Sequence, residues 1–586
     1  MSKPNRTLSA RFKKFNGVNI PDCHSGDEVM REIENFHIES DGSLKKRNGY
    51  KHFFHFDGGE IGTVWSGRIK GEFKCYLTVG SYLYSFDPSS RTYTAVGMIS
   101  ESSSTVSFFF LNDVLYIKDD QTIYTVGDTS LTPIHGYIPL YGKDWGTSYP
   151  GKVFQPINLL HKKVRISYLI GSPHTAMLAT QYPVKRILSV YRNGTKLNED
   201  EYVLDKNFNT VNIQSGVVTG ERYVVCVEYE SMPEPEAEYF AKCQHSKVIN
   251  ESEAQMIAVW GSPNDKSCLY ISPYISQEDF DASEQEVEGA GKFYFTTKSS
   301  IKTGDGSKEI TSVLKSREKL LIFSEKDLWT ANEESLKAGS LSITNLNPAF
   351  GCSSFYGSVM AQNDPITVSS SGIMRWSASD PDEVGILAQS ISEKVNTDLG
   401  ESFFKSARAY SNVENNQLWF LEPRSGGVAW IYDLGQRSWV KYTGLQNAVG
   451  FFELDGKTAF FSESDFYVFS SDLPYDIDAS GNEIPITATA KSGSLDFGSN
   501  EYKRLIGCEL AADLCGEELE LCISCDSKEK INVSPSSESE HSVFNIRTRS
   551  GRFLNLTLSL ASRGKSSQVI HGITLKAKEK IKGMKG

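Results

Sequence analysis

The chain has 586 residues, of which 39% are hydrophobic and 23% charged, and its formal net charge is -12. The composition is that of a soluble globular protein, and the length predicts about two to four domains. The acidic excess argues against a broad DNA-gripping surface, which would need a surplus of lysine and arginine.

Residues 1–50 are predicted to form an extended N-terminal arm and docking segment. The arm begins with basic residues and has no apolar signal segment, so we expect assembly in a reducing cytoplasm with free thiols. A helical turn or two is expected over 26–35, and Asp41-Gly42 predicts a turn between two short strands. Tyr50 is expected to lead into the first blade of the repeat described next.

One pattern recurs along most of the chain: a run of β-branched and aromatic residues, a small polar turn, and a second such run. Each copy predicts a β-hairpin. The clearest copies lie at 76–86, 114–124, 320–329, 366–376 and 458–469. A spacing of roughly 40 to 50 residues matches one four-stranded propeller blade. A single hairpin cannot bury its apolar face alone, so we expect the copies to stack into a closed ring.

The predicted fold class is therefore all-β: a β-propeller of about six or seven blades with an inserted small β-sandwich and a C-terminal β domain. Asn193-Gly194 predicts a tight hairpin in the insertion, and Ser231–Glu238 an acidic, proline-bearing linker after it. Residues 576–585 are interpreted as a basic tail. The predicted boundaries are 51–140 for the first blades, 141–250 for the inserted sandwich, 251–475 for the remaining blades and 485–586 for the C-terminal domain.

No catalytic, cofactor-binding or metal-binding residue is predicted, and the chain is not expected to be an enzyme. It contains no HExxH and no GxSxG motif. Gly289–Lys292 lacks both the earlier glycine and the hydroxyl residue that a phosphate-binding loop requires.

Four cysteines in the C-terminal region raise the alternative of a zinc site, which needs four convergent ligands. Cys522 and Cys525 are separated by three positions in an alternating strand, so their side chains face opposite sides. Buried thiols are therefore the favoured interpretation. The four cysteines are Cys508, Cys515, Cys522 and Cys525.

Two further patterns were weighed against simpler readings. Asp476–Gly481 is similar to the start of a calcium loop, but Thr487 stands where an EF-hand needs a glutamate, so a turn is favoured. Gly372 and Trp376 match the end of a box that repeats in propeller glycosidases, yet Ser370 replaces its acidic residue.

Four stretches, taken in order, carry a family resemblance. The first is Phe15-Asn-Gly-Val followed by Asn35-Phe-x-Ile-Glu-x-x-Gly-Ser-Leu-Lys-Lys-Arg-x-Gly-Tyr50. The second is Tyr191-x-Asn-Gly-x-x-Leu with Asp200-x-Tyr202. The third runs from Asn264-Asp265 through Tyr270-Ile-Ser272 and Asp279-Phe280 to 320–329, and the fourth from Phe350-Gly-Cys to Trp376. Leu495-Asp-Phe-Gly with Lys503-Arg504 adds a weaker match.

Together these stretches resemble the β-propeller nozzle, or tail tubular, family of short-tailed bacteriophages and its tail-accessory relatives. The resemblance implies a homo-oligomeric ring, usually a hexamer, beneath the portal and adaptor proteins of the virion tail. It also implies that viral DNA leaves through the lumen without sequence-specific binding, and that tail fibres or spikes attach outside.

Two other functions stay open. One is a propeller that binds a receptor or glycan, which exposed aromatic clusters on one ring face would favour. The other is a polysaccharide hydrolase, which would need a pocket with paired carboxylates.

Overall fold

The computed structural model of the chain divides into two compact units. Unit 1 comprises Met1–Ile61, Pro88–Arg91 and Ala349–Gly586, and unit 2 comprises Gly62–Asp87 and Thr92–Pro348. The structure describes residues 6–21, 29–100, 106–134, 140–143, 158–160, 163–170, 175–177, 184–207, 210–214, 223–231, 235–250, 254–272, 275–276, 294–296, 300–317, 319–332, 342–378, 386–526, 529–548 and 550–579.

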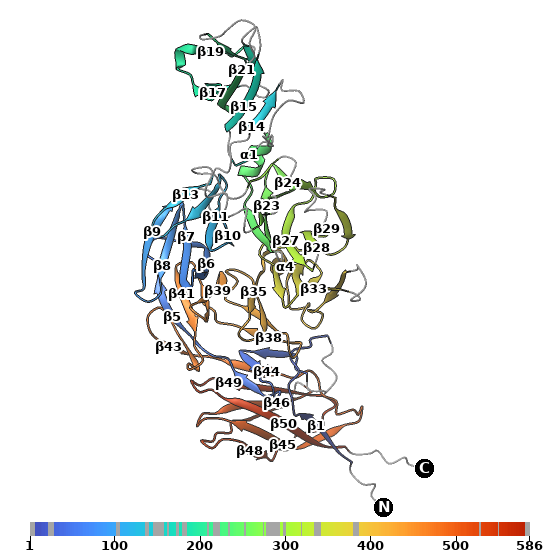
Figure 1. The fold of residues 1–586 in the computed structure, drawn as a ribbon. Helices are drawn as coiled ribbons and strands as arrows, with labels where there is room; N and C mark the ends of the chain where they lie inside the picture. Colours follow the sequence, from blue (N-terminus) through green and yellow to red (C-terminus); the bar gives the residue numbers. More distant parts are fainter. Residues whose placement is uncertain are drawn as a thin grey trace, which may run out of the picture. The chain divides into compact units, whose positions relative to one another are not determined.

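Seven sheets or sheet segments of four strands each are present in the described residues, and they confirm the predicted β-propeller (Figure 1). All five hairpins predicted from the repeat are confirmed by their strand pairings. Unit 2 holds four of the seven: β6 (Ile61–Ile69), β7 (Glu72–Val79), β8 (Tyr82–Asp87) and β9 (Thr92–Met98); β10 (Ser107–Leu111), β11 (Val114–Lys118), β12 (Ile123–Val126) and β13 (Leu131–Pro133); β22 (His245–Asn250), β23 (Ala254–Ser262), β24 (Asp265–Ile271) and β26 (Ser300–Lys302), with β25 (Ile275–Ser276) beside β23; and β27 (Ile310–Ser316), β28 (Lys319–Ser324), β29 (Leu328–Asn332) and β30 (Thr344–Asn347).

Unit 1 holds the other three blades, and the short helix α4 (Glu401–Ser406) lies between two of them in the chain. The strands are β31 (Ser358–Ala361), β32 (Asp364–Ser369), β33 (Gly372–Ala378) and β34 (Ile386–Ser390); β35 (Arg408–Asn412), β36 (Gln417–Leu421), β37 (Ala429–Asp433) and β38 (Ser438–Tyr442); and β39 (Gly450–Leu454), β40 (Lys457–Phe461), β41 (Asp465–Phe469) and β5 (Tyr50–His55).

The last blade is completed by a strand from the beginning of the chain. β5 pairs antiparallel with β41, so Tyr50 lies opposite Phe469 in the last blade, whereas the sequence predicted that it leads into the first one. Aromatic packing explains the difference: the Tyr50 ring meets the Phe460 ring edge-on at 5.0 Å and the Tyr467 ring at 5.4 Å. The same sheet continues through β42 (Tyr475–Ile477) and β43 (Glu483–Pro485).

The N-terminal segment supplies strands to three sheets of unit 1. β2 (Glu32–Glu34) pairs with β38 on one side and with β44 (Ala488–Lys491) on the other, so a nine-stranded sheet joins a blade to the C-terminal strands. The helical turn expected over 26–35 is wrong in its described part, because β2 has a strand partner on both sides and is extended. β3 (Phe36–Ile38) and β4 (Leu44–Lys46) form the hairpin expected around Asp41-Gly42.

The C-terminal β domain is a two-layered sandwich whose sheets lie one above the other (Figure 1). Strand β1 (Arg6–Phe12) pairs along its whole length with the last strand, Val569–Glu579. The predicted basic tail is wrong at 576–579, which belong to this strand; 580–585 lie outside the described residues. The remaining strands are β45 (Lys503–Asp513), β46 (Leu519–Cys525), β47 (Glu529–Val533), β48 (Ser542–Ile546), β49 (Leu556–Ser562) and β50 (Val569–Glu579).

The insertion in unit 2 is a small β-sandwich, as predicted, with one apolar core between its two sheets. Asn193 and Gly194 both have a positive φ, 46° and 85°, and they form the expected hairpin turn. Its strands are β14 (Leu140–Lys143), β15 (Lys163–Ile170), β17 (Val184–Arg192), β18 (Thr195–Lys196) and β21 (Tyr223–Ser231) in one sheet, and β16 (Thr175–Met177), β19 (Tyr202–Asp205) and β20 (Thr210–Ile213) in the other, with the 3-10 turn η1 (Glu199–Glu201) between β18 and β19.

The predicted linker 231–238 is wrong in its second half, because helix α1 (Pro235–Ala241) begins there. Proline suits the first helical position, and Glu236 and Glu238 suit the positive end of the helix dipole. Phe240 anchors the helix, since its buried ring lies 4.7 Å from that of Phe295. The blades resume at β22, which lies inside the predicted 141–250 segment.

Candidate functional site

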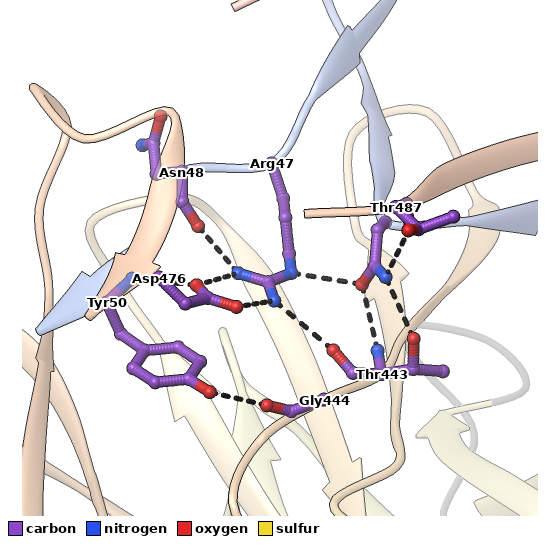
Figure 2. A network of polar contacts seen from close by, with 8 residues as sticks. Arg47, Asn48, Tyr50, Thr443, Gly444, Asp476 and Thr487 are labelled. Atoms are coloured by element: carbon purple, nitrogen blue, oxygen red, sulfur yellow. Dashed lines mark hydrogen bonds and ion pairs between the residues drawn. The ribbon is translucent and has the colours of Figure 1, made fainter. Parts of the chain in front are cut away.

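A buried polar network in unit 1 joins the N-terminal segment to the last two blades and to the strand that enters the C-terminal sandwich (Figure 2). Its centre is Arg47, which follows β4 and has a side chain that is only 1% exposed. Arg47 pairs with Asp476 of β42, which is 6% exposed. The pair is bidentate: Nη1 donates to Oδ1 at 2.9 Å and Nη2 to Oδ2 at 2.8 Å.

The remaining donors of the guanidinium are also satisfied. Nε donates to Oδ1 of Asn35 at 3.0 Å, Nη1 to the carbonyl of Asn48 at 3.0 Å, and Nη2 to the carbonyl of Thr443 at 3.2 Å. A guanidinium has five N–H groups, so each has an acceptor. A buried cation is tolerated only when its charge and all its donors have partners, because an unpaired one would lose its hydration without replacement.

Asn35 is the second hub of the network. Its Nδ2 donates to Oγ1 of Thr443 at 2.8 Å and to the carbonyl of Thr487, just before β44, at 2.9 Å. Its Oδ1 also accepts the backbone N–H of Thr443 at 2.9 Å. Its φ of 55° is a left-handed conformation that asparagine adopts more readily than most residues. One amide therefore connects the N-terminal segment, the end of β38 and the start of β44.

Gly49 and Tyr50 complete the network. A Cβ on Gly49 would lie 1.8 Å from the carbonyl oxygen of Tyr475, so only glycine allows this close approach of two backbones. The backbone N–H of Tyr50 donates to Oδ1 of Asp476 at 3.1 Å, and its hydroxyl donates to the carbonyl of Gly444 at 2.5 Å. Burial and the neighbouring Asp476 charge raise the pKa of Tyr50, so the phenol stays protonated.

A second buried cation, Lys46, lies directly before Arg47 in the chain. Burial lowers its pKa to about 8, and its ammonium donates to the carbonyls of Gly564 and Ser566. The charge of Arg47 is thus neutralised by a carboxylate, and that of Lys46 is solvated by backbone carbonyls. The network is therefore suited to holding backbone segments in place. The donors of Asn35, Lys46 and Arg47 named above are already hydrogen-bonded within the protein.

Part of the stretch that carries the family resemblance lies in this network. Asn35, Arg47, Gly49 and Tyr50 all belong to the stretch that carries the family resemblance, and the structure brings them together. Their partners in the blades and at β44 were missed, because they lie about 400 residues further along and no local pattern marks them.

The four cysteines weighed as a zinc site are not brought together: among the described residues, the group with metal-binding geometry contains no cysteine. Cys508 and Cys525 are buried, as expected of core thiols, and burial raises the pKa of Cys508 to about 12. Cys515 is exposed and Cys522 is only half-buried, so the expectation of a buried thiol is wrong at Cys515 and only partly met at Cys522.

The other weighed patterns have structural explanations. Asp476 is used by Arg47, and Asp478 accepts the backbone N–H groups of Ser480 and Asn482, so the turn favoured for this segment is confirmed. Trp376 is fully buried in the core of its blade. Residues 289–292, weighed as a phosphate loop, lie outside the described residues.

A cavity of about 440 Å³ lies beside β2, β44 and β49 in unit 1. Two of its charged groups pair with each other: Lys491 Nζ lies 2.8 Å from Oε2 of Glu32. Burial opposes ionisation of Glu32, but the hydrogen bond and charge of Lys491, together with Glu34 and Lys441, lower its pKa on balance. None of the lining residues that the structure describes is aromatic, so none can stack on a sugar. The lining residues are Ile20, Arg31, Glu32, Asp398, Lys491, Ser492, Thr557, Leu558 and Ser559.

Aromatic side chains do reach the surface of the first blade in unit 2. Tyr82 is 43% and Tyr93 36% exposed. Tyr84 lies between them, with ring centroids 6.3 Å from Tyr82 and 5.7 Å from Tyr93. This tyrosine cluster on β8 and β9 is the kind of surface that the glycan-binding alternative requires.

Comparison with known proteins identifies no family for the chain. No protein-family model and no curated protein matches the sequence. Similar solved structures include BamB from Moraxella catarrhalis (8% identity, TM-score 0.33, 75% of this chain and 91% of that one) and an exo-beta-1,3-galactanase from Phanerochaete chrysosporium (10% identity, TM-score 0.25, 88% of this chain and 99% of that one). At these scores the similarities carry no argument about activity.

The chain is thus a β-propeller protein with an inserted sandwich and a C-terminal sandwich. Within the described ranges, no helix has the length and apolar character needed to cross a lipid bilayer.

Proposed function

We propose that the protein is a structural component of a short-tailed bacteriophage virion: a tail nozzle or tail tubular subunit. In this role it forms a homo-oligomeric ring, passes viral DNA through the lumen, and carries fibres or spikes on its outside. It contacts adaptor and portal-side proteins and is assembled in the host cytoplasm.

One observation carries the proposal more than any other. The stretch from Asn35 to Tyr50, which resembles the opening of this family, is the stretch that fastens the N-terminal segment to the last blades of unit 1. The buried charge network supports a mechanical role, because such networks favour one rigid arrangement of the chain over others. The net charge of -12 also suits a wall that repels phosphate and lets DNA slide past.

The test is the assembly state of the purified full chain. Size-exclusion chromatography with light scattering should give a closed oligomer, and negative-stain electron microscopy should give rings with a central channel. A gel-shift assay at physiological salt should show no retention of duplex DNA. A monomer at all accessible concentrations, or tight DNA binding, would refute the proposal.

A second candidate is favoured by the tyrosine cluster of Tyr82, Tyr84 and Tyr93: a propeller that binds a host glycan or receptor. Partly exposed, mutually packed aromatic rings are suited to stacking on sugar faces. Glycan-array binding that is lost in Tyr82→Ala, with no ring formed by the wild type, would favour this function over the first. A hydrolase remains the third possibility, and release of sugar from surface polysaccharide would identify it.

A further inference from the structure

A group of two histidines and one aspartate lies at one end of the C-terminal sandwich, away from the Arg47 network in the chain and contributed by three strands or their ends. The group is Asp513, His541 and His571. One potential ligand atom from each residue lies within 4.8 Å of the other two.

The fold brings these residues together by specific local means. Asp513 is the last residue of β45, and its carboxylate accepts the backbone N–H of His541, which directly precedes β48. His571 occupies a bulge in β50: the register passes from Ala511 opposite Gly572 to Ala512 opposite Ile570, which leaves His571 without an opposite residue. A β-bulge turns a side chain out of its regular direction, and bulges are frequent beside functional sites.

The distances fit a shared metal ion. His571 Nε2 lies at hydrogen-bond distance, 3.0 Å, from Oδ2 of Asp513, and His541 Nδ1 lies 3.6 Å from Oδ1, so the two imidazoles approach different oxygens of one carboxylate. Ligands at about 2.1 Å from a tetrahedral ion are separated by about 3.4 Å, between these two values. The two imidazole rings lie 5.0 Å apart, so their nitrogens can approach one point without a clash of the rings.

The exposure of the three side chains fits an accessible but anchored site. The side chains of Asp513 and His571 are 19% and 26% exposed, and that of His541 is 75% exposed. The two inner ligands are therefore held by the sheet, and the outer one faces solvent, from which an ion can enter. Three protein ligands leave a position for water or for a ligand from another molecule.

From this convergence we propose that Asp513, His541 and His571 form a binding site for a divalent transition-metal ion of the zinc type. Two imidazoles and one carboxylate are ligands that Zn²⁺ and Ni²⁺ accept, whereas Mg²⁺ and Ca²⁺ prefer oxygen alone. The bound ion joins the end of β45 to β48 and β50, and so fixes β48 at the edge of its sheet.

A second histidine–aspartate group in the same unit provides the contrast. His52 Nε2 and His55 Nδ1 lie 2.9 and 2.8 Å from Asp465, but both approach the same oxygen, Oδ1. This group is not among those with metal-binding geometry in the described part of the chain. His55 has an exposed side chain (54%), which makes it a matched control for His541.

The experiment measures binding of Zn²⁺, and separately Ni²⁺, to the full chain by calorimetry and by equilibrium dialysis with elemental analysis. Cys515→Ser is used as the background, because Cys515 is an exposed thiol near the site. His541→Asn is the main variant, since asparagine tolerates the left-handed φ of 51° at this position. His55→Asn is the control, and hydrogen exchange of β48 with and without the ion is a second readout.

We expect one equivalent of ion per chain, at least about tenfold weaker binding in His541→Asn, and unchanged binding in His55→Asn. The ion should slow hydrogen exchange in β48, and Mg²⁺ should not. Binding of no ion by the parent chain would overturn the proposal, as would equal losses in the two histidine variants. Because His541 lies at the surface, its substitution should leave the fold intact, which circular dichroism checks.

Discussion

Replacing Arg47 by methionine should destabilise unit 1, because the buried Asp476 carboxylate loses its counter-ion. In Arg47→Met the carboxylate of Asp476 stays buried, 6% exposed, without a counter-ion. Breaking a buried pair in this way costs about 3–5 kcal/mol. The oxygens of Asn35, Asn48 and Thr443 also each lose one hydrogen bond that they accept from Arg47, which adds to the cost.

Adding Asp476→Asn to Arg47→Met should make the protein more stable, not less. The second substitution removes the unpaired charge, while the asparagine Oδ1 can still accept the backbone N–H of Tyr50. We expect the double variant to recover about 1–2 kcal/mol of the loss. Recovery through a second substitution is the signature of electrostatic dependence, because two independent losses would simply add.

Native-state hydrogen exchange with mass spectrometry is the appropriate assay, because a chain of two units has no single unfolding free energy. Exchange in β3, β4, β5 and β42 should accelerate roughly 150- to 5,000-fold in Arg47→Met, at a factor of ten per 1.36 kcal/mol. The strands β17 and β21 of the insertion serve as the internal reference. Lys405→Met, at an exposed ion pair with Glu401, is the matched control and should change nothing measurable. An effect of Arg47→Met below tenfold, or a double variant worse than the single one, would refute this reasoning.

Three other predictions concern single positions. Gly49→Ala should destabilise unit 1 by more than 3 kcal/mol (an order-of-magnitude figure, as for a severe core clash), because the new Cβ would lie 1.8 Å from the Tyr475 carbonyl oxygen; loss of soluble expression or of β5 protection measures this. Gly194→Ala should cost only about 1 kcal/mol, because its φ is 85° but nothing lies within 4 Å of the new methyl group; thermal unfolding of the insertion tests it, and a larger loss would contradict it. Burial lowers the pKa of His245 to about 4, so the unfolded chain takes up a proton near its normal value of 6.5 while the folded chain does not; stability of unit 2 should fall by about 3 kcal/mol as the pH drops from 6.5 to 4, and His245→Phe should remove that slope in a pH series of denaturant titrations.

The part of the fold that could be predicted from the sequence is the part whose information is local. A strand, a polar turn and a second strand lie within a dozen residues, so the hairpins at 320–329 and 458–469 could be identified from residue type alone. The alternation along β46 likewise marks a half-buried strand before any partner is known.

The pairings that join distant segments could not be predicted in this way. β2 has only three residues, and its extended conformation depends on the two strands beside it, which lie about 400 residues away. Nothing in 26–35 itself opposes a helical turn. The place of the Tyr50 strand in the last blade could not be predicted for the same reason, because an aromatic strand fits against any aromatic blade.

The candidate sites differ in the same way: some of their residues lie in a local sequence pattern and others do not. Arg47 and Asn35 stood in a recognisable stretch, but their burial and their partners came only from the structure. His541 and His571 were not singled out at all, since they are 30 positions apart and meet Asp513 only through a bulge. A signal could have been found only by asking which histidines lie next to strand ends in the same sheet.

The pairing of β1 with β50 sets a condition on biosynthesis. The first strand of the chain finds its only described strand partner in the last one, so it emerges from the ribosome hundreds of residues before that partner exists. Domains of a nascent chain generally mature in order of synthesis, and segments left without their partners are prone to aggregation. We therefore expect β1 to reach its native pairing only after β50 has been synthesised, slowly, and to be shielded in the meantime by a chaperone or by its own transient contacts.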